Sequence, residues 1–288
     1  MAVSISRSVA VKTLVNIFTN KAYSNIAVSA AFSDINIDGK DKALASALIY
    51  GVLDRKITID YILSAYIKTP VEKIKPITLN ALRIAVYQIM FMDKIPASAA
   101  VNETVNIVKA SKERYNASFV NGVLRSFLRE PKEIPKSDDI ESLSIRYSCP
   151  FGIIESFASD YGTKTAINLL EESLKKPPVT LRVNTIKTDT NSLIKELYNE
   201  GIISKTVDTG NALDILSGFD VAASSSYKKG LFHIEDLASQ KVISLINPKE
   251  NSRILDICSA PGGKTFTMAQ IMNNSGEIVA CDLYEHRV

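Results

Sequence analysis

The segment "ILDICSAPGGKT" (Ile254–Thr265) decides how the last part of the chain folds. An apolar run leads into a turn of small residues with two glycines, and "KTFTMAQIM" then begins a helix. Further on, "NNSG" turns the chain and "EIVACD" has the composition of a second strand. The pattern predicts a β-α-β unit with a glycine-rich first turn, in which the strand "SRILDIC" is buried. Because glycine lacks Cβ and a helix N-terminus offers unpaired N–H groups, a ligand can approach this turn closely.

The turn differs by one residue from a phosphate-binding P-loop, which needs Gly-x-x-x-x-Gly-Lys-Ser/Thr. The first glycine would fall at position 258, where the chain has Cys258. Pro261 has no N–H and a fixed φ, which weakens a nest of successive backbone N–H groups. Asp282 ends the second strand, the position at which doubly wound folds bind ribose hydroxyls. The pattern favours an adenosine-type ligand, with a degenerate P-loop triphosphatase as an alternative.

Two less specific interpretations of these side chains stay open. Asp282 could cap the helix that follows it, and Lys264 could be a solvated lysine of the first helical turn. A cation is not favoured at that end of a helix, so Lys264 is mildly suggestive of a ligand.

The composition is that of a globular protein. The chain has 288 residues, a soft prior of about two domains, with 46% hydrophobic and 23% charged residues. No apolar run reaches the roughly 18 residues that a membrane span needs. Three cysteines without a Cys-x-x-Cys pair make neither a disulfide framework nor a zinc site. We therefore expect a cytoplasmic protein that uses no membrane and no metal.

Residues 1–130 have helical periodicity throughout. Ala10, Leu14, Ile17 and Phe18 follow the spacing of an amphipathic helix. The segment "ITLNALRIAVYQIMFMDK" is apolar on most of its faces, which predicts a central, buried helix. The polar, proline-containing stretch "EPKEIPKSDD" then indicates a linker.

Residues 140–222 alternate between short helices and strands. "PPVTLRVNTIK" has strand alternation, "DTNSLIKELYNEG" predicts a helix that ends at Gly201, and "ISKTVDTG" and "ALDIL" predict further strands. We expect a small α+β module here, followed at residues 223–288 by the start of an α/β domain. The fold class is therefore multidomain.

Charge is distributed unevenly along the chain. Residues 1–130 carry 17 Lys and Arg against 10 Asp and Glu, a net charge of +7, whereas the remainder carries 17 against 21, a net charge of −4. A basic helical head suggests an anionic partner, although an ordinary solvated surface explains the charge equally well. The candidate phosphate contacts are Arg7, Arg83, Lys94, Arg125 and Arg129.

At this point several segments resemble a known family. "LDICSAPGGKT" is similar to the Cys-Ala-Ala-Pro-Gly-Gly-Lys-Thr motif of S-adenosyl-L-methionine-dependent RNA (cytosine-5) methyltransferases, and "ACDLYEHRV" to their second-strand segment. "GLFHIEDLASQKVISLI" resembles their Gln-Asp-x-x-Ser segment, with Glu235 where glutamine is usual. "PPVTLRVNTIK" resembles their Pro-x-x-Arg-x-Asn stretch. In the head, "LRIAVYQIMFMDKIPASAAVNETVNIVK" and "FVNGVLRSFLR" resemble a NusB-type RNA-binding domain.

The resemblance implies an all-α NusB-like head over 1–130, an α+β RNA-binding or linker module over 140–222 and an incomplete Rossmann-like methyltransferase domain over 223–288. It implies methylation of a cytidine C5 in small-subunit (16S) ribosomal RNA, with S-adenosyl-L-methionine as cofactor, by a monomer. The expected cofactor-binding residues are Cys258, Ser259, Ala260, Pro261, Gly262, Gly263, Lys264 and Asp282. Ser259 replaces an alanine of the motif, and the chain lacks the tryptophan found near "CPFGII" in the family.

The family's mechanism uses two cysteines that lie later in the methyltransferase domain. None of Cys149, Cys258 and Cys281 occupies such a position. We therefore expect a truncated product or partial sequence without catalytic residues, whose single β-α-β unit leaves a sheet edge and apolar surface bare. The alternative is a non-catalytic, NusB-like RNA-binding or transcription-regulating protein.

Overall fold

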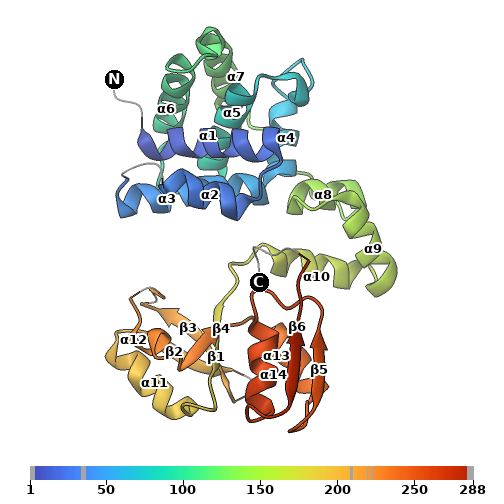
Figure 1. Ribbon diagram of the computed structural model, residues 1–288. Helices are drawn as coiled ribbons and strands as arrows, with labels where there is room; N and C mark the ends of the chain where they lie inside the picture. Colours follow the sequence, from blue (N-terminus) through green and yellow to red (C-terminus); the bar gives the residue numbers. More distant parts are fainter. Residues whose placement is uncertain (1–3, 34–36, 208–209, 219, 222, 284–288) are drawn as a thin grey trace. The chain divides into compact units, whose positions relative to one another are not determined.

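Figure 1 shows a computed structural model of the chain, which describes residues 4–33, 37–207, 210–218, 220–221 and 223–283. The chain divides into two compact units, Met1–Lys175 and Lys176–Val288, and each is described by itself. The last five residues of the segment "ACDLYEHRV" lie outside the described residues. Within the described ranges, no helix is both long and apolar enough to cross a membrane.

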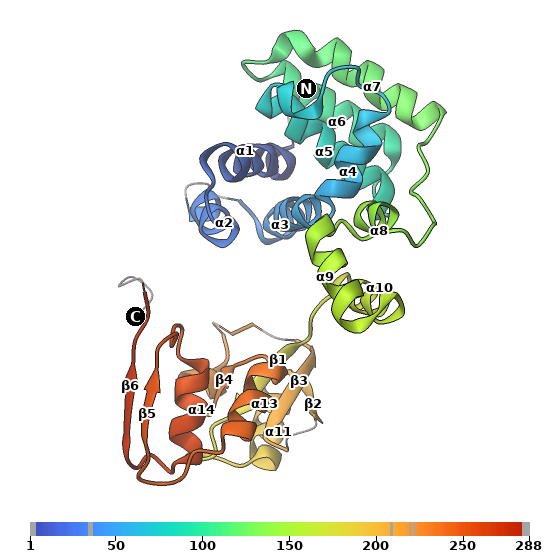
Figure 2. The ribbon, with the colours of Figure 1, turned by 90° about the vertical axis from the view of Figure 1, so that its right-hand side faces the viewer.

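The first unit begins with a helical domain, as the sequence predicts. Its helices are α1 (Ile5–Asn20), α2 (Ser24–Ser33), α3 (Gly39–Asp54), α4 (Lys56–Ser64), α5 (Pro76–Phe91), α6 (Ala97–Lys109) and α7 (Ala117–Arg129), with short 3-10 turns at Val71–Lys73 and Arg114–Asn116. Helix α5 contacts α1, α3, α4, α6 and α7 and lies between them (Figure 2). Its buried residues include Leu82, Ile84 and Val86, so the prediction of a central, buried helix is confirmed.

One predicted phosphate contact of this domain is wrong. Arg83 is buried on α5, and its Nε and Nη2 donate to the two carboxylate oxygens of Asp60 at 2.7 and 2.8 Å. A guanidinium paired in this bidentate way inside the domain serves the packing of α4 on α5 rather than a ligand. Lys94, Arg125 and Arg129 are exposed, and Arg7 is half-buried with its Nε donating to Gln88.

The start of α5 depends on a buried carboxylate. Pro76 occupies the first turn, and Glu113, which precedes α7, accepts hydrogen bonds from the N–H groups of Ile77 and Thr78 at 3.2 and 2.7 Å. The Thr78 hydroxyl also donates to Glu113, at 2.7 Å. Glu113 thus satisfies N–H groups that the first turn of a helix leaves unpaired.

Replacing Glu113 by alanine should lower the free energy of unfolding by about 1–3 kcal/mol, because buried donors on Ile77 and Thr78 lose their acceptor. Urea unfolding followed by circular dichroism measures the change. Glu133→Ala, which removes an exposed carboxylate, is the control and should leave stability nearly unaltered. Equal stabilities for the two variants would contradict this role of Glu113.

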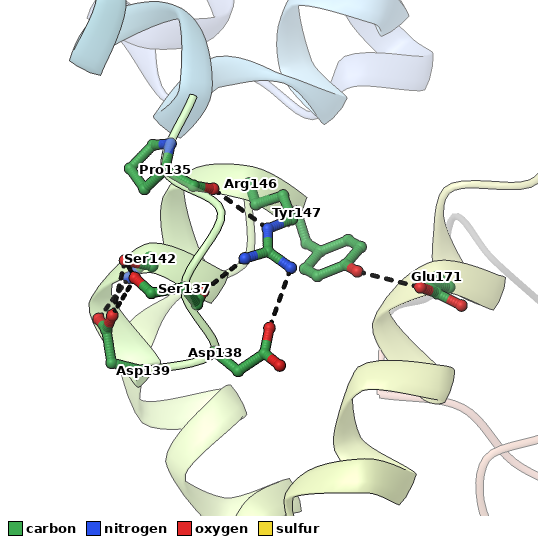
Figure 3. Close-up of polar contacts among 8 residues, drawn as sticks. All are labelled: Pro135, Ser137, Asp138, Asp139, Ser142, Arg146, Tyr147 and Glu171. Atoms are coloured by element: carbon green, nitrogen blue, oxygen red, sulfur yellow. Dashed lines mark hydrogen bonds and ion pairs between the residues drawn. The ribbon is translucent and has the colours of Figure 1, made fainter. Parts of the chain in front are cut away.

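Short helices follow the linker, as predicted: α8 (Ile140–Tyr147), α9 (Phe151–Tyr161) and α10 (Thr163–Ser173). They lie in the first unit. Leu143, Tyr147, Ile154 and Leu170 form their common core. The linker before α8 has no helix or strand, and Arg146 holds it through the carbonyl oxygens of residues 135 and 137 and the Asp138 carboxylate (Figure 3).

Asp139 caps the N-terminus of α8. Its carboxylate accepts hydrogen bonds from the Ser137 hydroxyl and from the N–H and hydroxyl of Ser142 (Figure 3). The hydrogen bond from the Ser137 hydroxyl, which has the largest effect, and the hydrogen bonds from Ser142 lower the pKa of Asp139 from 3.8 to about 2. A carboxylate whose pKa is lowered by folding stabilises the fold above its unfolded pKa, and this contribution is lost as the pH falls through the folded value.

We expect the wild type to be more stable than Asp139→Ala. This difference should have its full size at about pH 6 and should become smaller as the pH falls from about 4 to about 2. Thermal unfolding of both proteins across this range measures it. A difference of the same size at both ends of the range would show that the charge of Asp139 is not involved.

The second unit contains a four-stranded antiparallel sheet in the order β2-β3-β1-β4. Its strands are β1 (Val179–Val183), β2 (Ile203–Val207), β3 (Ala212–Ser217) and β4 (Phe232–Ile234), and α11 (Thr190–Asn199) packs against it through Leu193 and Leu197. Helix α11, strand β1 and the strands β2 and β3 are as predicted. Strand β4 was not predicted, because three residues are too few to show alternation. The short helix α12 (Ser225–Lys228) precedes β4, and α13 (Leu237–Ile246) follows it.

The β-α-β unit is present: β5 (Arg253–Asp256) and β6 (Glu277–Ala280) pair in parallel, and α14 (Gly263–Ile271) connects them. The prediction that the first strand is buried is wrong. Side chains alternate between the faces of a strand, and on one face Leu255 is 63% exposed beside its pairing partner Val279. Ile257 is 68% exposed. The expectation of bare apolar surface on this unit is therefore confirmed, since no other described strand pairs with this two-stranded sheet.

Candidate functional site

The turn between β5 and α14 is organised by the carboxylate at the end of β5. Asp256 Oδ1 accepts a hydrogen bond from the Cys258 N–H at 3.3 Å, and Oδ2 accepts one from the Thr265 hydroxyl at 2.7 Å. One side chain thereby holds both ends of the glycine-rich turn. The bond between Asp256 and Thr265 becomes visible only in the folded turn.

The end of β6 holds the middle of the same turn. The Ser259 N–H donates to the Cys281 carbonyl at 2.9 Å, and the Cys281 N–H donates to the Asp256 carbonyl at 2.8 Å. The Ala260 N–H donates to Asp282 Oδ2 at 3.1 Å. The fold therefore brings Asp282 to the turn, although 18 residues separate it from Lys264 in the sequence.

The N-terminus of α14 presents unused donors. Gly262 caps the helix with a φ of 105°, a left-handed conformation that favours glycine. Among the described residues, the structure gives no acceptor for the N–H groups of Gly263, Lys264 and Thr265. These groups, together with the positive end of the helix dipole, can bind an anionic or polar group of a ligand.

The predicted site residues thus lie in one place. The turn and the end of β6 bring together all of the residues that were predicted to bind the cofactor: Cys258, Ser259, Ala260, Pro261, Gly262, Gly263, Lys264 and Asp282. Ser259 is buried, whereas Cys258, Pro261 and Cys281 are exposed. Contact of these residues with a cofactor stays a prediction.

Beneath the turn lies a buried polar cluster that the sequence analysis did not assign to the site. Glu235, which follows β4, is 5% exposed and accepts a 2.6 Å hydrogen bond from the Thr267 hydroxyl of α14. His233 Nε2 lies 3.4 Å from the same carboxylate oxygen. Burial lowers the pKa of Arg182 on β1, and the nearby Glu235 carboxylate opposes that shift.

Glu235 also limits the space around Gly263. Its other oxygen, Oε1, is buried and has no hydrogen-bond partner among the described residues. A Cβ added at Gly263 would lie 3.3 Å from this oxygen. The cluster therefore fixes the first turn of α14 against the antiparallel sheet. In the sequence, this role could have been inferred from Glu235, an acidic residue at a position where the family that the chain resembles usually has glutamine.

The described residues of this unit contain no cluster of potential metal ligands. The described part of the chain contains no group of three or more His, Cys, Asp and Glu side chains that could hold a metal ion. The expectation that the protein uses no metal stays a prediction.

Comparison with known families gives three consecutive matches. The NusB family matches residues 4–129, the ferredoxin-like domain of RsmF/B-like methyltransferases matches residues 150–222, and the 16S rRNA methyltransferase RsmB/F family matches residues 243–288. The helical domain, the antiparallel module and the β-α-β unit each fall mainly within one of these ranges.

Curated relatives match the chain over almost all of its length. The probable ribosomal RNA small subunit methyltransferase B of Bacillus subtilis is 35% identical over 98% of this chain and 63% of the relative. The corresponding probable enzyme of Synechocystis is 28% identical over 98% of this chain and 64% of the relative. The chain thus spans somewhat less than two thirds of the length of these relatives.

A solved structure shows the same fold. The crystal structure of PH0851 superimposes with a TM-score of 0.75 at 21% identity and covers 100% of this chain and 65% of that chain. The family matches make the chain similar, in order, to a NusB domain, to a ferredoxin-like domain of RsmF/B-like methyltransferases and to part of the 16S rRNA methyltransferase RsmB/F family. Over nearly its whole length the chain is similar to ribosomal RNA small subunit methyltransferase B proteins.

Gly263→Ala should destabilise the protein, because the added methyl meets Glu235 Oε1, and the bond from Thr267 holds that carboxylate in place. Glu235→Ala should remove this conflict. We expect the two changes to be non-additive, with a coupling of about 0.5–3 kcal/mol in a double-mutant cycle followed by urea unfolding.

Gly122→Ala is the control for the glycine substitution, because a Cβ at Gly122 meets nothing within 4 Å. It should be neutral or slightly stabilising. Strict additivity of Gly263→Ala and Glu235→Ala would contradict the contact between the turn and the carboxylate.

Proposed function

We propose that this protein methylates C5 of a cytidine in small-subunit ribosomal RNA, with S-adenosyl-L-methionine as the cofactor. The observation that carries the proposal is the glycine-rich turn, which leads into three unpaired N–H groups of α14 and whose Ala260 N–H is bound by the carboxylate of Asp282. The names of the relatives support methylation of ribosomal RNA, and the C5 position and the cofactor come from the resemblance of the turn to its family motif.

The residues of the turn have separate roles in this proposal. Gly262 and Gly263 allow the ligand to approach the backbone, and the N–H groups of residues 263–265 donate to its polar atoms. Asp282 accepts hydrogen bonds from the two ribose hydroxyls. Asp256 orients the turn and Thr265 without touching the ligand. When bound, S-adenosyl-L-methionine supplies the methyl group.

The residues present fit such a cofactor better than a nucleoside triphosphate. The turn has Cys258 at the position of the first P-loop glycine, and Pro261 contributes no donor. A carboxylate at the end of β6 would repel a polyphosphate, but it matches the hydroxyl pair of a ribose. The same arrangement therefore favours a nucleoside cofactor.

RNA binding is assigned to the two modules that precede the methyltransferase segment. Residues 1–130 form the basic, NusB-like head, residues 140–222 form the second RNA-binding or linker module, and residues 223–288 begin the methyltransferase domain. Exposed cations of the head such as Lys94, Arg125 and Arg129 contact phosphates. The protein acts as a monomer in the cytoplasm, where its three cysteines remain free thiols.

The catalytic nucleophile is not assigned to a cysteine of this chain. Cys258 belongs to the turn, and the backbone of Cys281 holds that turn. Cys149 lies in the first unit, between α8 and α9, where burial raises the pKa of its thiol and disfavours the reactive thiolate.

Isothermal titration calorimetry of the chain with S-adenosyl-L-methionine tests the cofactor assignment. We expect binding, and we expect Asp282→Asn to weaken it about 10- to 100-fold, because an asparagine keeps an acceptor for the Ala260 N–H but loses the charge that two hydroxyls share. Glu277→Gln is the control, since its carboxylate is an exposed partner of Arg253 on the same two-stranded sheet.

Two outcomes would overturn the assignment. One is equal affinity of the Asp282→Asn and Glu277→Gln variants for the cofactor. The other is magnesium-dependent binding of ATP that disappears in Lys264→Ala, which would support the degenerate P-loop instead.

A further inference from the structure

The helical head contains a cavity between α6 and α7 that none of the predicted contacts explains. Its volume is about 380 Å³, within the range of small-ligand pockets. Helix α6 contributes Asn102, Asn106 and Lys109, spaced so that they lie along one face of the helix. Ser118 and Asn121 of α7 line the opposite side.

The amide groups of this cavity are largely unused by the protein. The side chains of Asn102 and Asn106 form no hydrogen bond with any described residue. The Asn121 side chain accepts a single hydrogen bond, from Arg125 Nε at 3.2 Å. Asn106 and Asn121 are half-buried. Amides that are partly shielded from water and lack protein partners are available to a ligand, and each offers one acceptor and two donors in a single plane.

The charge and the apolar surface of the cavity further restrict the class of ligand that it can bind. None of its lining residues is acidic, and Lys109 adds a positive charge, while Val105 and Ala117 supply apolar surface. Arg125 stands next to Asn121 on the exposed side of α7. The arrangement combines planar hydrogen-bonding groups with an apolar wall and two cations at the margin.

We propose that this cavity binds one unpaired nucleobase of a single-stranded RNA segment, with Asn106 and Asn121 reading its edge and Lys109 contacting the adjoining phosphate. The proposal rests on the proposed function, because it assumes that the head binds RNA. RNA is recognised in sequence-specific fashion mainly through unstacked bases of loops and single strands. An asparagine amide pairs with the N6 and N7 atoms of adenine through two hydrogen bonds, so adenine is the expected base.

A base explains the cavity better than a phosphate alone. A phosphate has only acceptors and would leave the amide oxygens of Asn102 and Asn106 without a partner. It would also make no use of Val105 and Ala117. A nucleobase has both donors and acceptors at its edge and an apolar face, and its own phosphate lies within the reach of a lysine at the margin.

Fluorescence anisotropy with short labelled homopolymers of adenylate, uridylate and cytidylate tests the proposal on the full chain. We expect the wild type to prefer oligoadenylate. Asn106→Ala and Asn121→Ala should each lower the affinity for oligoadenylate about fivefold or more and reduce the preference over the other two. Lys109→Ala should weaken the binding of all three to a similar extent and reduce its salt dependence.

The controls separate loss of recognition from loss of folding. Alanine is a better helix former than asparagine, so these variants should keep the melting temperature of the wild type. Asn25→Ala makes the same change at an exposed position of α2 and should leave binding unchanged. Binding of RNA with no change in base preference for Asn106→Ala and Asn121→Ala would overturn the cavity assignment and leave the proposed function standing.

Absence of any RNA binding by the wild-type chain would overturn both the cavity assignment and RNA binding by the head. Binding of S-adenosyl-L-methionine in the calorimetric experiment would then still distinguish this failure from a failure of the cofactor site. An affinity for oligoadenylate that falls equally in Asn25→Ala and Asn106→Ala would also count against the cavity.

Discussion

The hydrogen bonds of the Asp256 carboxylate are the interaction on which the candidate site depends. A turn rich in small residues has little side-chain packing of its own, and its glycines favour many backbone conformations in the unfolded chain. Asp256 restrains it at Cys258 and at Thr265, while the two residues that follow β6 hold Ser259 and Ala260. The three N–H groups at the start of α14 are left available because the turn is held by other groups.

The buried cluster around Glu235 extends this constraint to the antiparallel sheet. Glu235 and His233 come from the end of β4, Arg182 from β1, and Thr267 from α14. A buried carboxylate is costly unless it has partners, and here Thr267 donates to it while Arg182 lies close enough to interact through its charge. The position of α14, and with it the direction in which the turn presents its donors, therefore depends on a module that precedes it in the chain.

The helical head uses its charges in two different ways. Arg83 and Asp60 neutralise one another inside the domain, and the Glu113 carboxylate accepts hydrogen bonds at the start of α5. The cations that remain exposed, such as Lys109 and Arg125, lie near neutral amides rather than carboxylates. Net charge therefore overstates how many cations can reach a nucleic acid, because burial and pairing decide which of them face the solvent.

The sequence by itself determined the helical head, the linker, the presence of the strands β1 to β3 and the glycine-rich turn, because periodicity and turn residues act locally. The tertiary structure decided what depends on pairing between distant segments. It placed Arg83 inside the domain, added β4 to the sheet and put Glu235 beneath Gly263. It also left Leu255 exposed, since an apolar strand is buried only where another layer covers its face. The resemblance to a methyltransferase motif pointed to the turn, whereas the folded chain supplied the hydrogen bonds that hold Asp282 against it.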